Sequence, residues 1–193
     1  MTSKTELPIL EFPDRAAWEA WLGENHDVAV GVWLKVAKKG APRPTVTYAE
    51  ALEDAIRYGW IDGQKRGFDE HFWLQRFTAR SPRSKWSQIN RQKASELIEQ
   101  GRMQPAGLAQ VQAAQRDGRW EQAYEPQGNA TVPPDFQEAL DRHPAAKAFF
   151  ETLGGARRYA FLYRLHHVTK PQARAKRIEN YIALLSAGKT LHD

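Results

Sequence analysis

Valine or leucine occupies every second position from Val28 to Val36, and Ala29, Gly31, Trp33 and Lys35 lie between them. A period of two is typical of a β-strand with one buried face. Trp60–Ile61 and His71–Phe77 predict two further strands, because β-branched and aromatic residues gather there between turn residues. In the last of these segments both faces are largely apolar, which indicates a strand in the middle of a sheet.

Apolar residues spaced by three and four positions predict helices elsewhere. Thr47 and Glu50 form a capping box that begins one helix, and Gly59 ends it. Pro105 is expected at the first position of another helix. The remaining predicted helices cover residues 14–22, a segment from Ser84 or Ser87 to Gln100, and several segments of residues 135–188, the last of them capped by Thr169. In the segment that ends at Gln100, the predicted inner face consists of Ile89, the stem of Lys93, Leu97 and Ile98.

These elements predict a helix-rich α+β protein with a small antiparallel sheet of about three strands covered by helices. Residues 119–134 are the best candidate for a linker, because Pro and Gly recur there without a clear period. We therefore expect an α+β domain over residues 1–118 and an all-helical region over residues 135–193. With about 60 residues, the second part is marginal for folding alone, and we expect it to pack on the first.

Composition narrows the functional classes. The chain has no cysteine, which excludes disulfides, thiol catalysis and thiolate metal sites. Its longest apolar runs are only a few residues, so we expect no transmembrane segment. The first residues carry charges and proline in place of an apolar signal core, which predicts a cytoplasmic protein.

The net charge of +5 is unevenly distributed. Residues 64–93 carry eight Lys and Arg against two acids, and residues 154–177 carry seven against none. Such segregation favours attraction of anions. The alternative is that both segments form ordinary solvated faces.

Two residues near the strands are candidates for chemistry. Asp62 could serve as a general base or a hydrogen-bond acceptor, or it could be a turn residue that bonds local backbone, because Asp-Gly favours turns. Arg76 could bind an anion through its guanidinium fork, or it could form a structural ion pair with an acid of the helix that begins after Thr47. On the strand of Arg76, alternation places Trp73, Gln75 and Phe77 on one face and Phe72, Leu74 and Arg76 on the other.

The segment from Thr78 to Ser87 combines cations, hydroxyls and an indole just before a predicted helix. Unpaired amides and the dipole at a helix start favour an anion, so phosphate, sulfate or carboxylate would suit this place. The alternative is simple capping of the helix by Ser84 or Ser87 with solvated charges around it. No glycine-rich nucleotide motif, nucleophile motif, metal-ligand spacing or cofactor motif is present, so no catalytic residue, metal or cofactor is predicted.

Three blocks of this region resemble the bacteriocin-protection, YdeI/OmpD-associated family of bacterial proteins: Gly59–Gly63, Trp73–Phe77 and Ser81–Asn90. The resemblance continues through Glu99–Gly107 and Lys170–Ile178, and so extends over nearly the whole chain. It implies a link to tolerance of bacteriocins and cationic peptides and to an outer-membrane porin. It implies no catalytic residues.

We therefore hypothesise a non-enzymatic binding protein whose partner is a small anionic ligand or an acidic protein surface. The first alternative is an enzyme that uses Asp62 as acid or base and Arg76 and Arg80 as an anion clamp. The second is a nucleic-acid-binding protein that uses both basic segments, although no known motif supports it. The predicted ligand-binding residues are Trp60, Asp62, Trp73, Arg76, Arg80, Arg83, Ser84, Lys85, Trp86, Ser87 and Asn90.

Overall fold

The computed structural model describes residues 6–191 and confirms the helix-rich α+β class. The chain forms two compact units, which meet in sequence between Ala123 and Tyr124. The first unit contains the whole sheet and four helices, and the second is entirely helical. Each unit has its own cluster of buried apolar residues.

The sheet of the first unit has four strands in the order β1-β2-β4-β3. Their bounds are Ile9–Glu11 for β1, Gly31–Ala37 for β2, Trp60–Gly67 for β3 and Phe72–Ala79 for β4. The predicted three strands are all present. The predicted antiparallel sheet of about three strands corresponds to β2, β4 and β3, and the prediction missed a fourth strand, β1, which pairs parallel to β2. With only three residues, β1 is too short for alternation to reveal it.

The second strand begins later than its apolar alternation suggests. Val28 and Val30 are 74% and 77% exposed, and β2 starts only at Gly31. A Cβ at Gly31 would lie 2.6 Å from Thr78 Cγ2 and 2.7 Å from the Phe77 carbonyl oxygen, so β2 and β4 approach each other closely at this glycine. The pairing of β2 with β4 therefore begins at Gly31, where the two backbones are close together.

The first unit's helices begin at well-defined caps. Their bounds are Arg15–Asn25 for α1, Tyr48–Arg57 for α2, Gln88–Glu99 for α3 and Pro105–Arg116 for α4. The predicted capping box of Thr47 and Glu50 is present at α2, and Pro105 occupies the first turn of α4 as predicted. Of the two candidate serines, Ser87 caps α3, and its Oγ accepts a hydrogen bond from the Asn90 amide.

The inner face of α3 differs from the predicted one. Asn90, Ala94 and Leu97 point inward, whereas Ile89 and Ile98 are exposed. Asn90 shares the face of Ala94 and Leu97 because these residues are three and four positions apart. Choosing residues by hydrophobicity alone therefore selected a face that is rotated about the helix axis.

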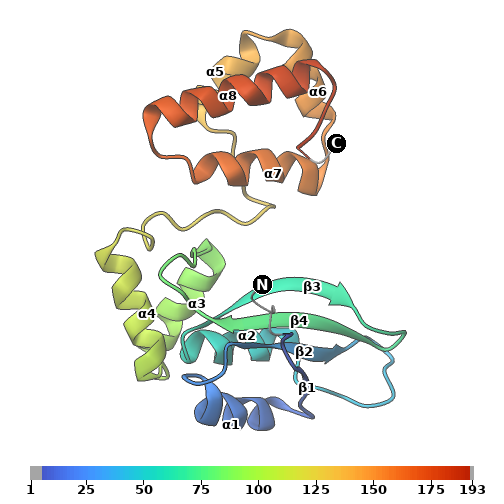
Figure 1. Cartoon of the computed structure of the whole chain (residues 1–193), viewed down its shortest axis with the longest axis vertical. Coiled ribbons are helices and arrows are strands. Elements are labelled where there is room, and N and C mark those ends of the chain that lie inside the picture. Colours follow the sequence, from blue (N-terminus) through green and yellow to red (C-terminus); the bar gives the residue numbers. More distant parts are fainter. Residues whose placement is uncertain (1–5, 192–193) are drawn as a thin grey trace. The chain divides into compact units, whose positions relative to one another are not determined.

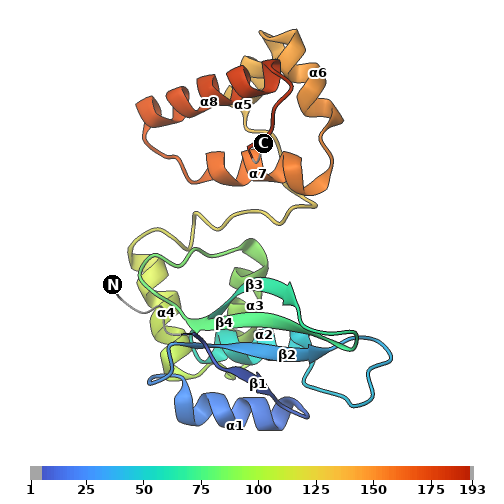
Figure 2. The same cartoon turned by 45° about the vertical axis from the view of Figure 1, so that its right-hand side comes forward.

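Helices α1 and α2 lie against one face of the sheet (Figures 1 and 2). The core forms between them and includes Trp18 of α1 and Ile56 of α2, both almost fully buried. On the sheet, Phe77 of β4 contacts Trp18 with 5.6 Å between ring centroids. The face that contains Phe77 is called the helix face below, and the other is called the open face.

A β-bulge interrupts the pairing of β3 with β4. Asp62 is opposite Phe77 and Lys65 is opposite Gln75, so β3 has one residue more than β4 in this interval. The Gln75 side chain is buried, and its Nε2 donates hydrogen bonds to the carbonyls of Gly63 at 2.9 Å and Gln64 at 3.4 Å. The Asp62-Gly63 pair thus lies at a bulge within β3. A turn at this pair was one of the predicted alternatives, and the structure does not have it.

The second unit consists of four helices around an aromatic core. Their bounds are Pro134–Asp141 for α5, Pro144–Thr152 for α6, Gly155–His166 for α7 and Pro171–Ser186 for α8. Phe136, Phe150, Phe161 and Tyr181 pack edge to face at its centre. The predicted cap of α8 was Thr169; the structure places Lys170 at this position, without a side-chain capping bond.

None of the helices within residues 6–191 combines the length and the apolar character that a bilayer-spanning segment requires.

Candidate functional site

The two tryptophans closest to the predicted site belong to the core. Trp60 is fully buried, and its indole Nε1 donates a hydrogen bond to the His26 carbonyl at 2.9 Å. Trp86 is also buried and packs edge-on against Trp120, with 4.9 Å between ring centroids. Both rings therefore stabilise the first unit and leave little surface for a ligand.

Arg80 is buried beside Trp86. Only 6% of Arg80 is exposed, and its guanidinium carbon lies 3.6 Å from the centre of the Trp86 ring. Its Nη1 donates a hydrogen bond to the Lys85 carbonyl at 3.2 Å, which ties the 81–87 loop to the end of β4. The geometry is that of a structural cation–π contact.

The loop before α3 uses most of its hydroxyls internally. The Ser81 amide donates to Ser84 Oγ at 2.9 Å, and Ser87 caps α3. Arg119 Nη1 donates to the Ser84 carbonyl at 2.8 Å and holds the loop from outside. Arg83 and Lys85, two of the predicted anion-binding cations, are exposed, although partial burial lowers the pKa of Lys85.

Asp62 belongs to a polar cluster on the helix face. Its Oδ2 accepts a hydrogen bond from the Tyr48 hydroxyl at 2.8 Å, and its Oδ1 accepts one from Asn90 Nδ2 at 3.3 Å. Trp73 packs against Tyr48, and Lys65 lies over the Trp73 ring with 4.1 Å from Nζ to the centroid. The structure thus brings together Asp62, Trp73 and Asn90 of the predicted set.

Arg76 lies on the open face, opposite to this cluster. The acids considered as its partners bond elsewhere: Glu53 and Asp54 pair with Arg15, and Glu50 bonds Thr47. Among residues 6–191, no carboxylate forms an ion pair with Arg76, and its buried Nε has no hydrogen-bond partner. An Asp62 carboxylate and an Arg76 fork facing one pocket, as the enzyme hypothesis requires, are therefore not found in this arrangement.

The Arg76 side chain faces a pocket of about 440 Å³ on the open face. Arg66 of β3 is stacked over the Trp33 ring, 4.1 Å from its guanidinium carbon to the centroid. A Cβ at Gly63 would lie 3.7 Å from aliphatic carbons of Arg76, an ordinary van der Waals contact, so Gly63 is directly beside this side chain. The pocket is lined by Glu6, Leu7, Val30, Trp33, Gln64, Arg66 and Arg76. We call it the sheet pocket.

Of the seven residues that line the sheet pocket, only Arg76 was among the predicted site residues, and the prediction missed Glu6, Leu7, Val30, Trp33, Gln64 and Arg66. The alternation of β2 already separated Trp33 and Lys35 from the valines and leucine of the core. These large polar and aromatic residues on the outer face of β2 were the sequence signal that could have indicated a binding site on the open face. The positions of Gln64 and Arg66 depend on the bulge, which alternation does not reveal.

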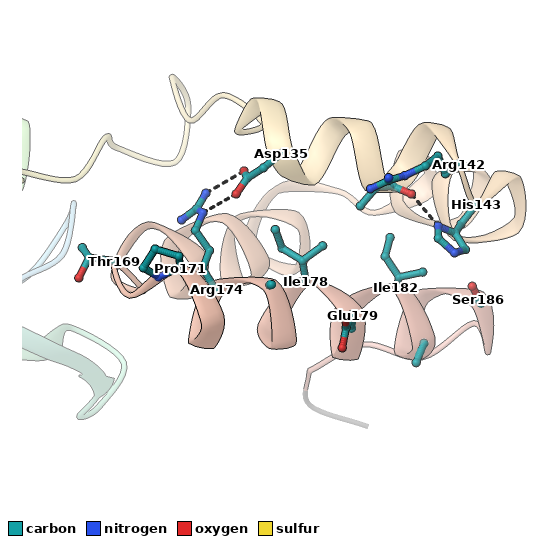
Figure 3. Close-up of a pocket in the computed structure, with 13 residues that line it drawn as sticks. Asp135, Arg142, His143, Thr169, Pro171, Arg174, Ile178, Glu179, Ile182 and Ser186 are labelled. Carbon is teal, nitrogen blue, oxygen red and sulfur yellow. Dashed lines mark hydrogen bonds and ion pairs between the residues drawn. The ribbon is translucent and has the colours of Figure 1, made fainter.

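A second hollow lies on the C-terminal unit between α5 and α8 (Figure 3). It has a volume of about 740 Å³, and Ala139, Ile178 and Ile182 form its floor. At one end Arg174 Nη2 donates to Asp135 at 2.9 Å, and its Nη1 donates to the Leu165 carbonyl at 2.8 Å. The Asp135 carboxylate neutralises this arginine, and the groove is mainly apolar.

The second basic segment contributes a third hollow on the outer side of α7. Tyr124, Tyr159 and Tyr163 line it together with Arg164. Tyr159 donates a hydrogen bond to the Glu125 carbonyl at 2.8 Å, and burial raises the pKa of Tyr159 to about 12. Within the described range, no group of three or more His, Cys, Asp and Glu side chains is placed to hold a metal ion.

Comparison with protein families divides the chain in a similar way. Residues 10–110 match the model described as Domain of unknown function (DUF8412). Residues 129–188 match the model described as Bacteriocin-protection, YdeI or OmpD-Associated (OmdA), which confirms the predicted resemblance over this segment. The resembling blocks between Gly59 and Gly107 fall in the first match, so the predicted extent over nearly the whole chain was too large. No curated protein and no solved structure matches the chain.

Proposed function

This chain belongs to the family described as Domain of unknown function (DUF8412), and from the geometry of its sheet we propose that it is a binding protein for a small planar anion. The ligand occupies the sheet pocket, and the class we favour is a phosphorylated metabolite or nucleotide. The observation that carries the proposal is Arg76, a half-buried guanidinium that faces this pocket without a carboxylate partner among residues 6–191.

Burial of an unpaired cation costs free energy unless an anion or water compensates it. A guanidinium fork is suited to a phosphate or carboxylate, because it donates two parallel hydrogen bonds to two oxygens. In the sheet pocket, Arg76 would supply these bonds, and Arg66 would add a second positive charge. The volume of about 440 Å³ is within the usual range for small-molecule sites.

The rest of the pocket supports a planar ligand. The Arg66 guanidinium lies over the Trp33 ring, so a planar ligand would stack on this guanidinium. Gln64 offers an amide that both donates and accepts hydrogen bonds. Glu6 is the one carboxylate that lines the pocket, and it disfavours an anion at that end. We therefore place the charged end of the ligand at Arg76 and away from Glu6.

The proposal does not include catalysis. Asp62 is bonded to Tyr48 and Asn90 on the helix face, and the Arg76 fork is on the open face. We place the binding in the cytoplasm, where phosphorylated metabolites and nucleotides are abundant. Recovery of the protein in the periplasmic fraction of its cells would contradict this compartment.

A thermal-shift screen of phosphorylated metabolites and nucleotides tests the proposal. A ligand at 100 times its Kd stabilises the folded protein by about 2.7 kcal/mol, a shift of several degrees in Tm. We expect Arg76→Gln to abolish the shift and Glu6→Gln to increase the affinity several-fold. Isothermal titration calorimetry would then give the Kd of each variant.

Neighbouring residues of β3 provide a matched pair of variants. Arg66 lies over Trp33 on the open face, and Lys65 lies over Trp73 on the helix face. Arg66→Ala and Lys65→Ala remove the same charge from adjacent positions, and only Arg66→Ala is expected to weaken binding. Equal effects of the two variants, or no stabilising compound at all, would refute the sheet pocket as an anion site.

The description of the C-terminal match names bacteriocin protection, and we propose that anion binding contributes to such protection here. A deletion strain complemented with the Arg76→Gln variant should then be as sensitive to bacteriocin as the strain without the protein. Full protection by this variant would show that bacteriocin tolerance does not depend on anion binding in the sheet pocket.

A further inference from the structure

One face of α7 carries tyrosines in place of the aliphatic residues that fill the core. Tyr159 and Tyr163 are four positions apart and share this face, whereas Phe161 and Leu165 point into the core. Ala156 and Ala160 lie on the same face and leave space beside the rings. Together with Tyr124 and Arg164 these residues line a shallow pocket of about 370 Å³, which we call the tyrosine face.

The rings of the tyrosine face are held in place before any partner binds. Tyr124 packs edge-on against Tyr163, with 4.9 Å between centroids and 88° between planes. Tyr159 lies 5.8 Å from Tyr163, and its hydroxyl is fixed by the bond to the Glu125 carbonyl. Such rings stack on a planar group at a small cost in side-chain entropy.

The charge around the tyrosine face is strongly positive and almost unpaired. Residues 154–177 contain seven Lys and Arg and no acid. Of these seven, only Arg174 forms an ion pair with any residue between 6 and 191, and its partner is Asp135. Arg157, Arg164 and Lys170 are exposed, so an external anion can reach them.

These properties select among possible partners. A cationic partner would be repelled by the arginines. A membrane surface would require exposed apolar side chains, and the large hydrophobic residues exposed in the described part of the chain all lie before Tyr124. Aromatic rings beside unpaired cations are the combination that binds single-stranded nucleic acid, in which bases stack on the rings and phosphates contact the cations.

We propose that the tyrosine face binds single-stranded nucleic acid. One base stacks against Tyr163 in the space that Ala156 and Ala160 leave open. Arg164 and Arg157 contact the phosphates on either side of that base. The site uses a different unit and different residues from the sheet pocket, so the two proposals are independent.

Fluorescence anisotropy of the full chain with a labelled single strand of about 12 nucleotides tests the proposal. We expect binding that weakens steeply as salt increases, and weaker binding to a duplex of the same sequence. Tyr163→Ala should weaken binding by about 5- to 100-fold, and Tyr163→Phe should bind as the wild type does, because it keeps the ring.

Arginine variants separate a local site from general charge. Arg164→Gln is expected to lower the slope of log K against log salt by about 0.7, the value for one phosphate contact on a single strand. Arg142→Gln removes the same charge at the end of α5 and should leave the slope unchanged. Arg66→Ala in the sheet pocket should leave oligonucleotide affinity unchanged.

Three results would overturn the proposal. The first is a duplex that binds as tightly as the single strand. The second is equal salt slopes for Arg164→Gln and Arg142→Gln. The third is wild-type affinity for a folded Tyr163→Ala variant, whose integrity circular dichroism would verify. If Tyr163→Ala does not fold, the comparison of the salt slopes of Arg164→Gln and Arg142→Gln tests the proposal by itself.

Discussion

At the scale of single residues, the arginines of the first unit differ mainly in their partners. Asp54 is fully buried and accepts hydrogen bonds from Arg15 at 2.7 and 2.9 Å and from Arg57 at 3.0 Å. This carboxylate therefore joins α1 to α2. Arg76 is also partly buried, but no acid between residues 6 and 191 pairs with it, so arginines of one unit differ in whether their charge is neutralised within the described structure.

Replacement of the central acid of this network should destabilise the protein strongly. Asp54→Ala leaves Arg15 and Arg57 without their shared buried partner, and the loss of one side of a buried pair costs about 3–5 kcal/mol. Urea unfolding followed by circular dichroism measures this loss. Asp14→Ala is a suitable control, because it removes an exposed acid that only caps α1 and costs about 1 kcal/mol. A similar loss for both variants would contradict the role of Asp54.

At the scale of elements, local rules located the helix starts, and long-range contacts decided the rest. The capping box at Thr47 and the proline at the start of α4 depend on neighbouring residues only, and both were predictable. The strand β1 and the bulge in β3 depend on partner strands and were not. The same division applies to the site, since Arg76 could be chosen from its strand, but its separation from the acids of α2 depends on which face of the sheet the helices cover.

The contact between α2 and α4 gives a prediction at this scale. A Cβ at Gly107 would lie 2.2 Å from the Arg57 carbonyl oxygen and 2.5 Å from Met103 Sδ. Alanine would gain about 1 kcal/mol in helix propensity over glycine, but the clash with backbone requires α4 to move away. We expect Gly107→Ala to destabilise the protein by about 1–3 kcal/mol in chemical unfolding.

Gly67→Ala provides the comparison, because a Cβ at Gly67 meets no atom within 4 Å. This variant should differ from the wild type by less than about 1 kcal/mol. A Gly107→Ala protein as stable as Gly67→Ala would show that α4 adjusts without cost.

At the scale of the whole molecule, the paired carboxylates predict sensitivity to acid. Hydrogen bonds from Arg43 lower the pKa of Glu11 from 4.5 to about 2, and Arg174 likewise lowers the pKa of Asp135. The pKa of Glu53 is also lowered, mainly by Arg15. A carboxylate with a lowered pKa in the folded state stabilises the protein above its unfolded pKa, and this contribution is lost as the pH falls through the folded value.

The urea midpoint should therefore remain constant from pH 7 to about pH 5 and fall between about pH 4.5 and pH 2. Each exposed pair contributes about 1 kcal/mol or less, so the sum amounts to a few kcal/mol. Glu11→Gln should flatten part of the fall and lower the stability at pH 7. A midpoint that rises on acidification would contradict this electrostatic account.

The extra residue in β3 can be removed by deletion, which would test the role of the bulge. Between Asp62 and Lys65 the strand takes three steps where its neighbour takes two, so deletion of Gly63 would produce an uninterrupted ladder and leave Lys65 and Arg66 on their present sides. The shortened protein would keep its architecture, but Gln64 would occupy the place beside Arg76 that now has no side chain. The pocket would then have a different shape on the same sheet, and under the proposed function the loss of one codon would change which ligand it selects.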